Sequence, residues 1–188
     1  MGSKKVYIVL SQSYTILSRI IKNITKDKYS HVSISFNDKC TDMYTMGRRF
    51  TRWPFSGVYK NESIYRGVYN ISKNAEILIY ELDVEDIQYE NIKRLLDEYG
   101  KNSKGYNFIG LVLALFNKKL DRNKYYCSEF IYKVLSDDTV CIFQKTDDAV
   151  KPMDFEKIDN LKKVYEGKVN EYKLLNPEFN SLNKKISA

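Results

Sequence analysis

The sequence predicts a single α+β domain, and two kinds of apolar pattern point to it. Residues 5–10 and 75–83 are short apolar runs rich in Ile, Val and Tyr, as in buried β-strands. Residues 14–25, 84–99 and 126–135 instead carry apolar side chains at helical spacing. The chain has 188 residues and shows no internal repeat, linker or low-complexity segment, so one folding unit is expected.

The first part of the chain predicts a strand, a helix and a hairpin in that order. The strand at 5–10 is followed by the amphipathic helix at 14–25. The segment 31–36 alternates strictly between apolar and polar residues, which is typical of a half-buried strand. The sequence Asn-Asp-Lys that follows favours a turn, and 41–46 is expected to return as the second strand of the hairpin.

The middle of the chain mixes clear and unclear signals. Residues 48–59 (RRFTRWPFSGVY) are basic and aromatic without periodicity, which predicts an irregular loop and a candidate wall over a nearby site. After the strand at 75–83, the helix at 84–99 is expected to end at Gly100 as its C-cap. Residues 106–116 are apolar on nearly all sides and predict a buried helix.

The last part of the chain predicts one more helix and one more hairpin. The helix is expected at 126–135. Short apolar groups at 164–165 and 172–174, separated by Glu-Gly-Lys, favour a final hairpin. We therefore expect one domain over 1–176 and a polar C-terminal tail over 177–188.

Composition is typical of a soluble globular protein. Apolar residues make up 43% of the chain and charged residues 29%. The longest apolar stretch, 108–116, is far shorter than the roughly 20 residues that a membrane span needs. The first residues lack the long apolar core and cleavage site of a secretory signal, so a cytoplasmic location is expected.

Charge and cysteine content narrow the expected partners and cofactors. The net charge of +7 is spread along the chain without a basic run that would mark a nucleic-acid arm, so no nucleic-acid partner is expected. Action at an anionic membrane surface is a weaker alternative. The 3 cysteines form no CxxC pair, which disfavours a zinc site and a disulfide framework. We expect no metal and no cofactor, and free thiols in a reducing compartment.

Two residues form a candidate pair for acyl-transfer chemistry. His31 is the only histidine of the chain and opens a predicted strand on its polar face. Cys127 lies where a predicted helix begins, and the positive end of a helix dipole favours a thiolate. A cysteine and a histidine from distant parts of the chain are the usual layout of a cysteine hydrolase. The plainer alternatives are a small buried cysteine and a structural histidine.

Four segments, read together, resemble a known family. They are YSHVSISF at 29–36, DMYTMGRR at 42–49, YNFIGLV at 106–112 and NKYYCSEFIYKVL at 123–135. In this order they resemble the circularly permuted branch of the NlpC-type papain-like hydrolases, which includes YiiX-like proteins and the lecithin retinol acyltransferase group. The resemblance implies a permuted papain-like fold, in which an antiparallel sheet packs against helices that include the cysteine helix.

The resemblance also implies roles for individual residues. Cys127 matches the family's nucleophile and His31 its base. A polar residue on the strand after the histidine should orient the imidazole. Thr45 aligns best with this position and shares the His31 face if the hairpin turn is long. If the turn is tight, Asp42 and Tyr44 share that face instead, because one residue of register exchanges the two faces. Asp42 is the chemically stronger alternative.

Further site residues are expected near the thiol. The backbone N–H of Cys127 at the helix start is a candidate oxyanion donor, and Gln12 could add a side-chain amide. Tyr126 precedes the nucleophile and either lines the substrate cleft or simply packs. Glu129 lies two residues after the cysteine, and a carboxylate at that position opposes a thiolate unless it is turned away.

The function that this reading implies is a cysteine amidase or peptidase. Cys127 would form a thioester with a peptide, amide or acyl small-molecule substrate, with His31 as general base and acid. Two alternatives use the same fold. One is a lipid or thioester acyltransferase, and the other is a catalytically silent module that binds an amide or acyl ligand.

Overall fold

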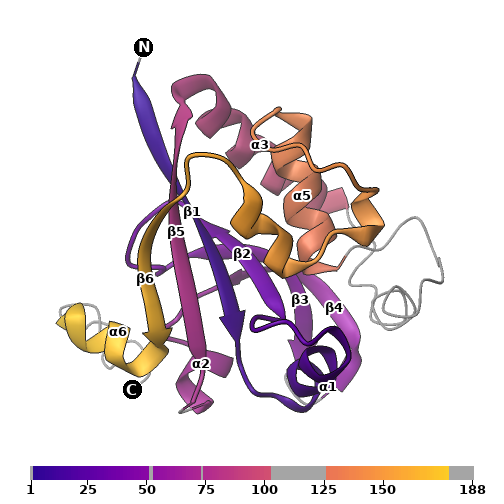
Figure 1. Cartoon of the computed structure of the whole chain (residues 1–188), viewed down its shortest axis with the longest axis vertical. Helices are drawn as coiled ribbons and strands as arrows, with labels where there is room; N and C mark the ends of the chain where they lie inside the picture. The colour runs from indigo at the N-terminus through magenta and orange to yellow at the C-terminus, as the bar shows by residue number, and fades with distance from the viewer. Residues whose placement is uncertain (1, 51–52, 73, 103–125, 178–188) are drawn as a thin grey trace.

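A six-stranded antiparallel sheet forms the centre of the molecule, with the strand order β4-β3-β2-β1-β5-β6. The computed structural model describes residues 2–50, 53–72, 74–102 and 126–177 (Figure 1). The strands are β1 (Ser3–Gln12), β2 (His31–Ser35), β3 (Met43–Phe50), β4 (Trp53–Glu62), β5 (Glu76–Glu85) and β6 (Lys162–Lys168).

Helices cover both faces of this sheet and one of its ends. Together with the sheet they give the α+β architecture that the apolar patterns predict. The α-helices are α1 (Ile16–Thr25), α2 (Val68–Ile71), α3 (Asp86–Asn102), α5 (Cys127–Asp137) and α6 (Val169–Leu175), with the 3₁₀ helices η1 (Asp147–Ala149) and η2 (Pro152–Lys157) between α5 and β6.

Strand β1 shows how the sheet separates two cores. Its side chains alternate between the two faces of the sheet. Ile8 and Leu10 are buried in the core that also holds α3 and α5, which lie over one face of the sheet (Figure 1). Tyr7 and Val9 are buried in a second core, which includes Tyr69 of α2 and residues of α6. A strand buried on both faces reads as an unbroken apolar run, which explains the strong signal at this position.

The expected loop over 48–59 is wrong, because most of this segment is strand. Strands β3 and β4 pair from Met43 with Glu62 to Phe50 with Trp53, with one irregularity between Arg48 and Phe50. Strand β4 forms one edge of the sheet, where a proline such as Pro54 is tolerated since its outer side needs no ladder hydrogen bonds. The pairing with β3 therefore specifies this strand, rather than any periodicity of its own.

The expected C-cap at Gly100 is also wrong. Helix α3 continues to Asn102, and Gly100 is buried inside its last turn. A Cβ atom at this position would lie 2.5 Å from the ring of Tyr59. The glycine therefore permits a close approach of α3 to β4 instead of ending the helix.

The expected C-terminal hairpin is replaced by a strand and a helix. Strand β6 pairs with β5, from Glu76 with Lys168 to Glu81 with Lys162. The residues after Lys168 form α6, whose Tyr172 packs on Tyr165 at a ring-centroid distance of 4.6 Å. The sheet thus gains its sixth strand from a segment expected to pair with itself.

The other predicted strands and helices agree with the structure where it describes them. Strands β1, β2 and β5 and helices α1 and α5 fall on the segments that apolar patterns predict, within a few residues at their ends. The helix expected at 106–116 lies outside the described residues. Within the described part of the chain, no helix combines the length and the apolar character needed to cross a membrane.

Candidate active site

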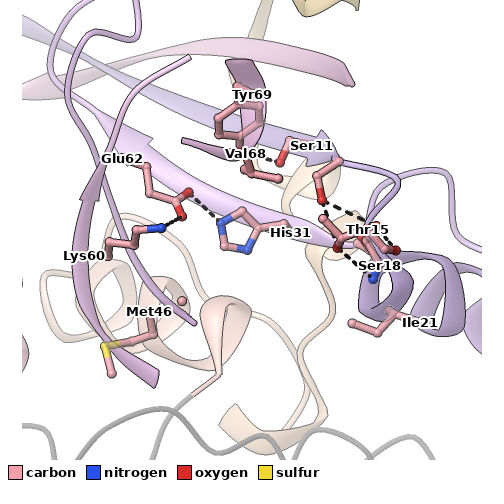
Figure 2. A pocket seen from close by; sticks show the side chains of 13 residues that line it. Ser11, Thr15, Ser18, Ile21, His31, Met46, Lys60, Glu62, Val68 and Tyr69 are labelled. Carbon is pink, nitrogen blue, oxygen red and sulfur yellow. Dashed lines mark hydrogen bonds and ion pairs between the residues drawn. The ribbon is translucent and has the colours of Figure 1, made fainter. Parts of the chain in front are cut away.

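His31 is the first residue of β2. It pairs with Ser11 of β1, whereas the ladder between β2 and β3 begins only at Ile34. The imidazole points toward β4, where its Nε2 lies 3.1 Å from Oε2 of Glu62 (Figure 2). The side chain is 23% exposed, so a reactant could reach one side of the ring.

Glu62 ends β4 and binds two basic side chains. Its Oε2 meets His31, and its Oε1 lies 3.2 Å from Nζ of Lys60. Burial alone would raise the pKa of this carboxyl. The attraction of His31 and Lys60 outweighs burial and lowers the pKa of Glu62 to about 2. Glu62 is therefore an anion at every physiological pH, and Nε2 of His31 is held as an N–H donor to it.

Cys127 is the first residue of α5 and is buried beside His31. The first N–H groups of a helix have no partner within it, so this end of α5 carries partial positive charge. Burial lowers the pKa of His31, but the charge of the Cys127 sulfur, that of Glu62 and hydrogen bonds to both raise it to about 10. With Nε2 held by Glu62, Nδ1 is the ring nitrogen that remains for the sulfur. The imidazole thus lies between a thiol and a carboxylate.

The other two cysteines have different surroundings. Cys40 is buried in the core with α2 and α6, and its pKa is raised by burial and by the charge of Asp38. Burial raises the pKa of Cys141 to about 12. Both are therefore neutral thiols, as expected of structural cysteines.

The two residues proposed to orient the imidazole make other contacts. Ile34 pairs with Tyr44, which is the register of the longer turn. Thr45 is fully buried, and its hydroxyl donates to the carbonyl of Val32 at 2.8 Å. Asp42 accepts hydrogen bonds from Thr41 at 3.0 Å and from Asn61 at 3.1 Å. The carboxylate bonded to His31 belongs to Glu62, one strand further along the sheet.

Thr45 has a structural task in this arrangement. The carbonyl of Val32 precedes the part of β2 that pairs with β3, so it lacks a ladder partner from that strand. The hydroxyl of Thr45 supplies the missing donor. Thr45 thus supports the strand end that carries His31 and does not itself bond to the imidazole.

The expected oxyanion and cleft residues are both buried. Gln12 is fully buried, where its Oε1 accepts a hydrogen bond of 2.7 Å from Ser30 and its Nε2 points to the carbonyl of Ser18 at 3.5 Å. One amide hydrogen is therefore left for another acceptor. Tyr126 is the N-cap residue of α5, and its N–H donates to Glu129 at 3.4 Å. This contact ties Glu129 to the helix start as part of a capping box.

His31 and its partner Glu62 line a pocket. Its described lining includes Lys60 and Glu62 of β4, Tyr69 of α2 and several hydroxyl side chains from the end of β1 and the start of α1. Ser11 lies 2.8 Å from the hydroxyl of Tyr69 at its back (Figure 2). The expectation that the segment 48–59 forms a wall over the site concerns side chains, such as those of Trp53 and Phe55, that the structure does not describe. Within the described ranges, no group of acidic, cysteine and histidine side chains could hold a metal ion.

Glu62 is the site residue that sequence reasoning missed. It follows Lys-Asn at the end of a strand that shows no alternation, so periodicity does not place it beside any partner. The sequence offers one chemical signal for Glu62. A buried lone histidine needs a partner, and Glu62 is the first acidic residue after Asp42.

Comparison with known proteins adds no assignment, because no protein-family model matches the chain and no curated protein matches it significantly.

Proposed function

We propose that this chain is a cysteine hydrolase of the permuted papain-like, NlpC-type kind, which cleaves an amide or peptide bond. The observation that carries the proposal is the position of His31, with Glu62 bonded to Nε2 and the sulfur of Cys127 close to the same ring. A nucleophile, a base and a group that orients the base are the minimum that acyl transfer by a thiol requires.

The first half of the reaction forms a thioester. The Cys127 thiolate attacks the carbonyl carbon, and the negative charge moves to the carbonyl oxygen. The N–H of Cys127, at the start of α5, is a backbone donor for that oxyanion. The intermediate then collapses and breaks the C–N bond. The leaving amine takes the proton from Nδ1 of His31, and the acyl group stays on sulfur.

The second half uses water as the acceptor. Neutral His31 removes a proton from water, and the hydroxide attacks the thioester. The carboxylic acid leaves, and the proton on His31 and the charge on Cys127 are restored. Glu62 stays ionised throughout and holds the ring in one orientation, because its pKa of about 2 lies far below the working range. An acyltransferase would share the first half and replace water with another nucleophile.

The test is the rate of alkylation of each cysteine by iodoacetamide as a function of pH, read by mass spectrometry. We expect Cys127 to react well below the pKa of about 8.5 of a free thiol. Cys40 and Cys141 serve as internal controls and should react slowly, since burial raises the pKa of both. In His31→Ala the acidic reactivity of Cys127 should disappear.

Two outcomes would overturn the proposal. One is a Cys127 that reacts no faster than Cys40 and Cys141 in native protein, while all three react equally after unfolding. The other is a pH profile of Cys127 that His31→Ala leaves unchanged, with circular dichroism showing that the variant is folded. Either result would favour the silent amide-binding or acyl-binding module.

A further inference from the structure

Two pockets adjoin at the end of β4 and together form a groove that starts at His31. They share Lys60, Glu62, Val68 and Tyr69. The first pocket includes His31, and the second continues past the end of β4 to Arg66. We call this surface the β4–α2 groove. It leads away from His31 between the last residues of β4 and the start of α2.

The charges of the β4–α2 groove favour an anion. Lys60 and Glu62 form an ion pair of 3.2 Å, so their charges offset each other. Glu62 is at the same time bonded to His31, whose raised pKa keeps it positive at neutral pH. Arg66 is exposed and has no ion-pair partner among the described residues. Three basic groups, His31, Lys60 and Arg66, thus face two acidic ones, Glu62 and the Cys127 thiolate beside His31, and the balance along this surface is positive.

The position of the groove relative to the reacting atoms says which half of a substrate it would hold. In acyl transfer by a thiol the acyl half is bonded to sulfur, and the leaving amine takes its proton from the histidine. His31 lines the first pocket, whereas Cys127 is not among the described lining residues. The groove therefore extends from the leaving-group side of the site.

We propose that the β4–α2 groove binds a carboxylate carried by the leaving amine, so that the substrate is an N-acylated amino acid or a peptide bond next to a free C-terminal carboxylate. This inference rests on the proposed hydrolase function. Lys60 lies nearest to His31 and meets the carboxylate first, because both basic groups bind the same Glu62 side chain. Arg66 lies further along the groove and adds a second cation with a planar set of donors that suits a carboxylate.

The test measures binding to the folded protein and does not need a reactive thiol. In a Cys127→Ala background, turnover is blocked and His31 still provides one unique set of imidazole proton signals, since the chain has a single histidine. The probes are N-acetylglycine, its neutral analogue N-acetylglycinamide and inorganic phosphate, each titrated at fixed ionic strength. We expect N-acetylglycine to shift the His31 signals at a concentration at least about five-fold lower than N-acetylglycinamide.

Two arginine variants test whether Arg66 is a cation that binds the carboxylate of N-acetylglycine. Arg66→Gln should weaken N-acetylglycine binding about two- to five-fold, as expected for one partly exposed cation, and leave N-acetylglycinamide unaffected. Arg94→Gln is the matched control, because Arg94 is an exposed arginine on α3 whose partner is Glu98 of the same helix. It should leave the binding of both probes unchanged.

Three results would overturn the inference. They are equal binding of N-acetylglycine and N-acetylglycinamide, no effect of Arg66→Gln, and inorganic phosphate that binds as tightly as N-acetylglycine, which would indicate a general anion site. Failure of the hydrolase proposal is seen separately. An unactivated Cys127 in the alkylation assay, combined with carboxylate-selective shifts of His31, would leave a carboxylate-binding groove without hydrolysis.

Discussion

At the scale of single residues, His31 depends on its two neighbours for its charge. Burial alone would favour the neutral ring, but Cys127 and Glu62 raise the pKa of His31 to about 10. In the proposed hydrolysis, this raised pKa would keep a proton on His31 for the leaving amine over the whole physiological range.

Replacing Glu62 by Gln should lower the pKa of His31. The amide keeps the size of the side chain and a hydrogen-bond acceptor but removes the negative charge, so His31 loses one of the two groups that raise its pKa. The change is measured directly from the pH dependence of the His31 proton signals. We expect the pKa to fall by about 1 pH unit or more, and the acidic alkylation of Cys127 to fall with it.

Asp42→Asn is the matched control for this substitution. Asp42 is a carboxylate near the start of β3 whose hydrogen bonds go to Thr41 and Asn61 rather than to His31. Its removal should leave the His31 titration unchanged. A His31 pKa that responds to Asp42→Asn as strongly as to Glu62→Gln would show that general charge, and not the Glu62 contact, sets the titration.

Thr45→Val should reduce stability without changing the chemistry of the site. The substitution preserves shape but leaves the buried carbonyl of Val32 without the hydroxyl that lies 2.8 Å away. An unsatisfied buried carbonyl costs about 1–3 kcal/mol, which urea denaturation can detect. The His31 pKa should stay at its wild-type value. A shifted pKa with normal stability would instead restore Thr45 as the residue that orients the ring.

At the scale of elements, apolar patterns predict the inner strands, miss the edge strand β4 and give the edge strand β6 the wrong partner. Strands β1 and β5 are buried enough to give unbroken apolar runs. Edge strands β4 and β6 have no such signal, because their conformation comes from hydrogen bonds to β3 and β5. The error reaches the site, since His31 and Cys127 lie on predicted elements and Glu62 lies on β4. A residue on an unpredicted strand cannot be paired with its partner from sequence spacing.

Gly100→Ala tests how closely α3 packs on β4. Alanine favours a helix by about 1 kcal/mol over glycine, so helix propensity alone predicts a more stable protein. The new Cβ would lie 2.5 Å from the ring of Tyr59, which cannot move freely because it also packs on Phe130 at 5.8 Å between ring centroids. We expect a net loss of about 1–3 kcal/mol in the free energy of unfolding, from overpacking.

Lys101→Ala provides the comparison on the same helix turn. The Lys101 side chain is 74% exposed and pairs with Asp97 on the surface, so its removal should change the free energy of unfolding by about 0.5 kcal/mol or less. A Gly100→Ala variant as stable as Lys101→Ala would mean that α3 and β4 separate at little cost.

At the scale of the whole molecule, the sheet brings together residues from distant parts of the chain. His31 comes from β2, Glu62 from β4 and Cys127 from α5. The strand order places β2 and β4 on either side of β3, so the bond from His31 to Glu62 spans the intervening strand where the β2–β3 ladder has not yet begun. The carboxylate of Glu62 lies over Gly47 of β3, where a Cβ atom would be 3.4 Å from Oε1.

The ion pair of Glu62 and His31 should also make the free energy of unfolding depend on pH. The pKa of Glu62 falls from 4.5 to about 2 in the folded chain, so its contribution to stability is complete above pH 4.5 and is lost as the pH falls toward 2. The pKa of His31 rises from 6.5 to about 10, so its contribution is complete below pH 6.5 and is lost as the pH rises toward 10.

The free energy of unfolding of wild type minus that of Glu62→Gln should therefore be largest between pH 4.5 and pH 6.5 and decline on both sides. Urea denaturation of both proteins from about pH 3 to about pH 9 measures it, and carboxylates such as Asp154 and Glu166, whose pKa values are also lowered, cancel in the difference. A difference that stays constant across this range would show that Glu62 stabilises the fold by packing alone.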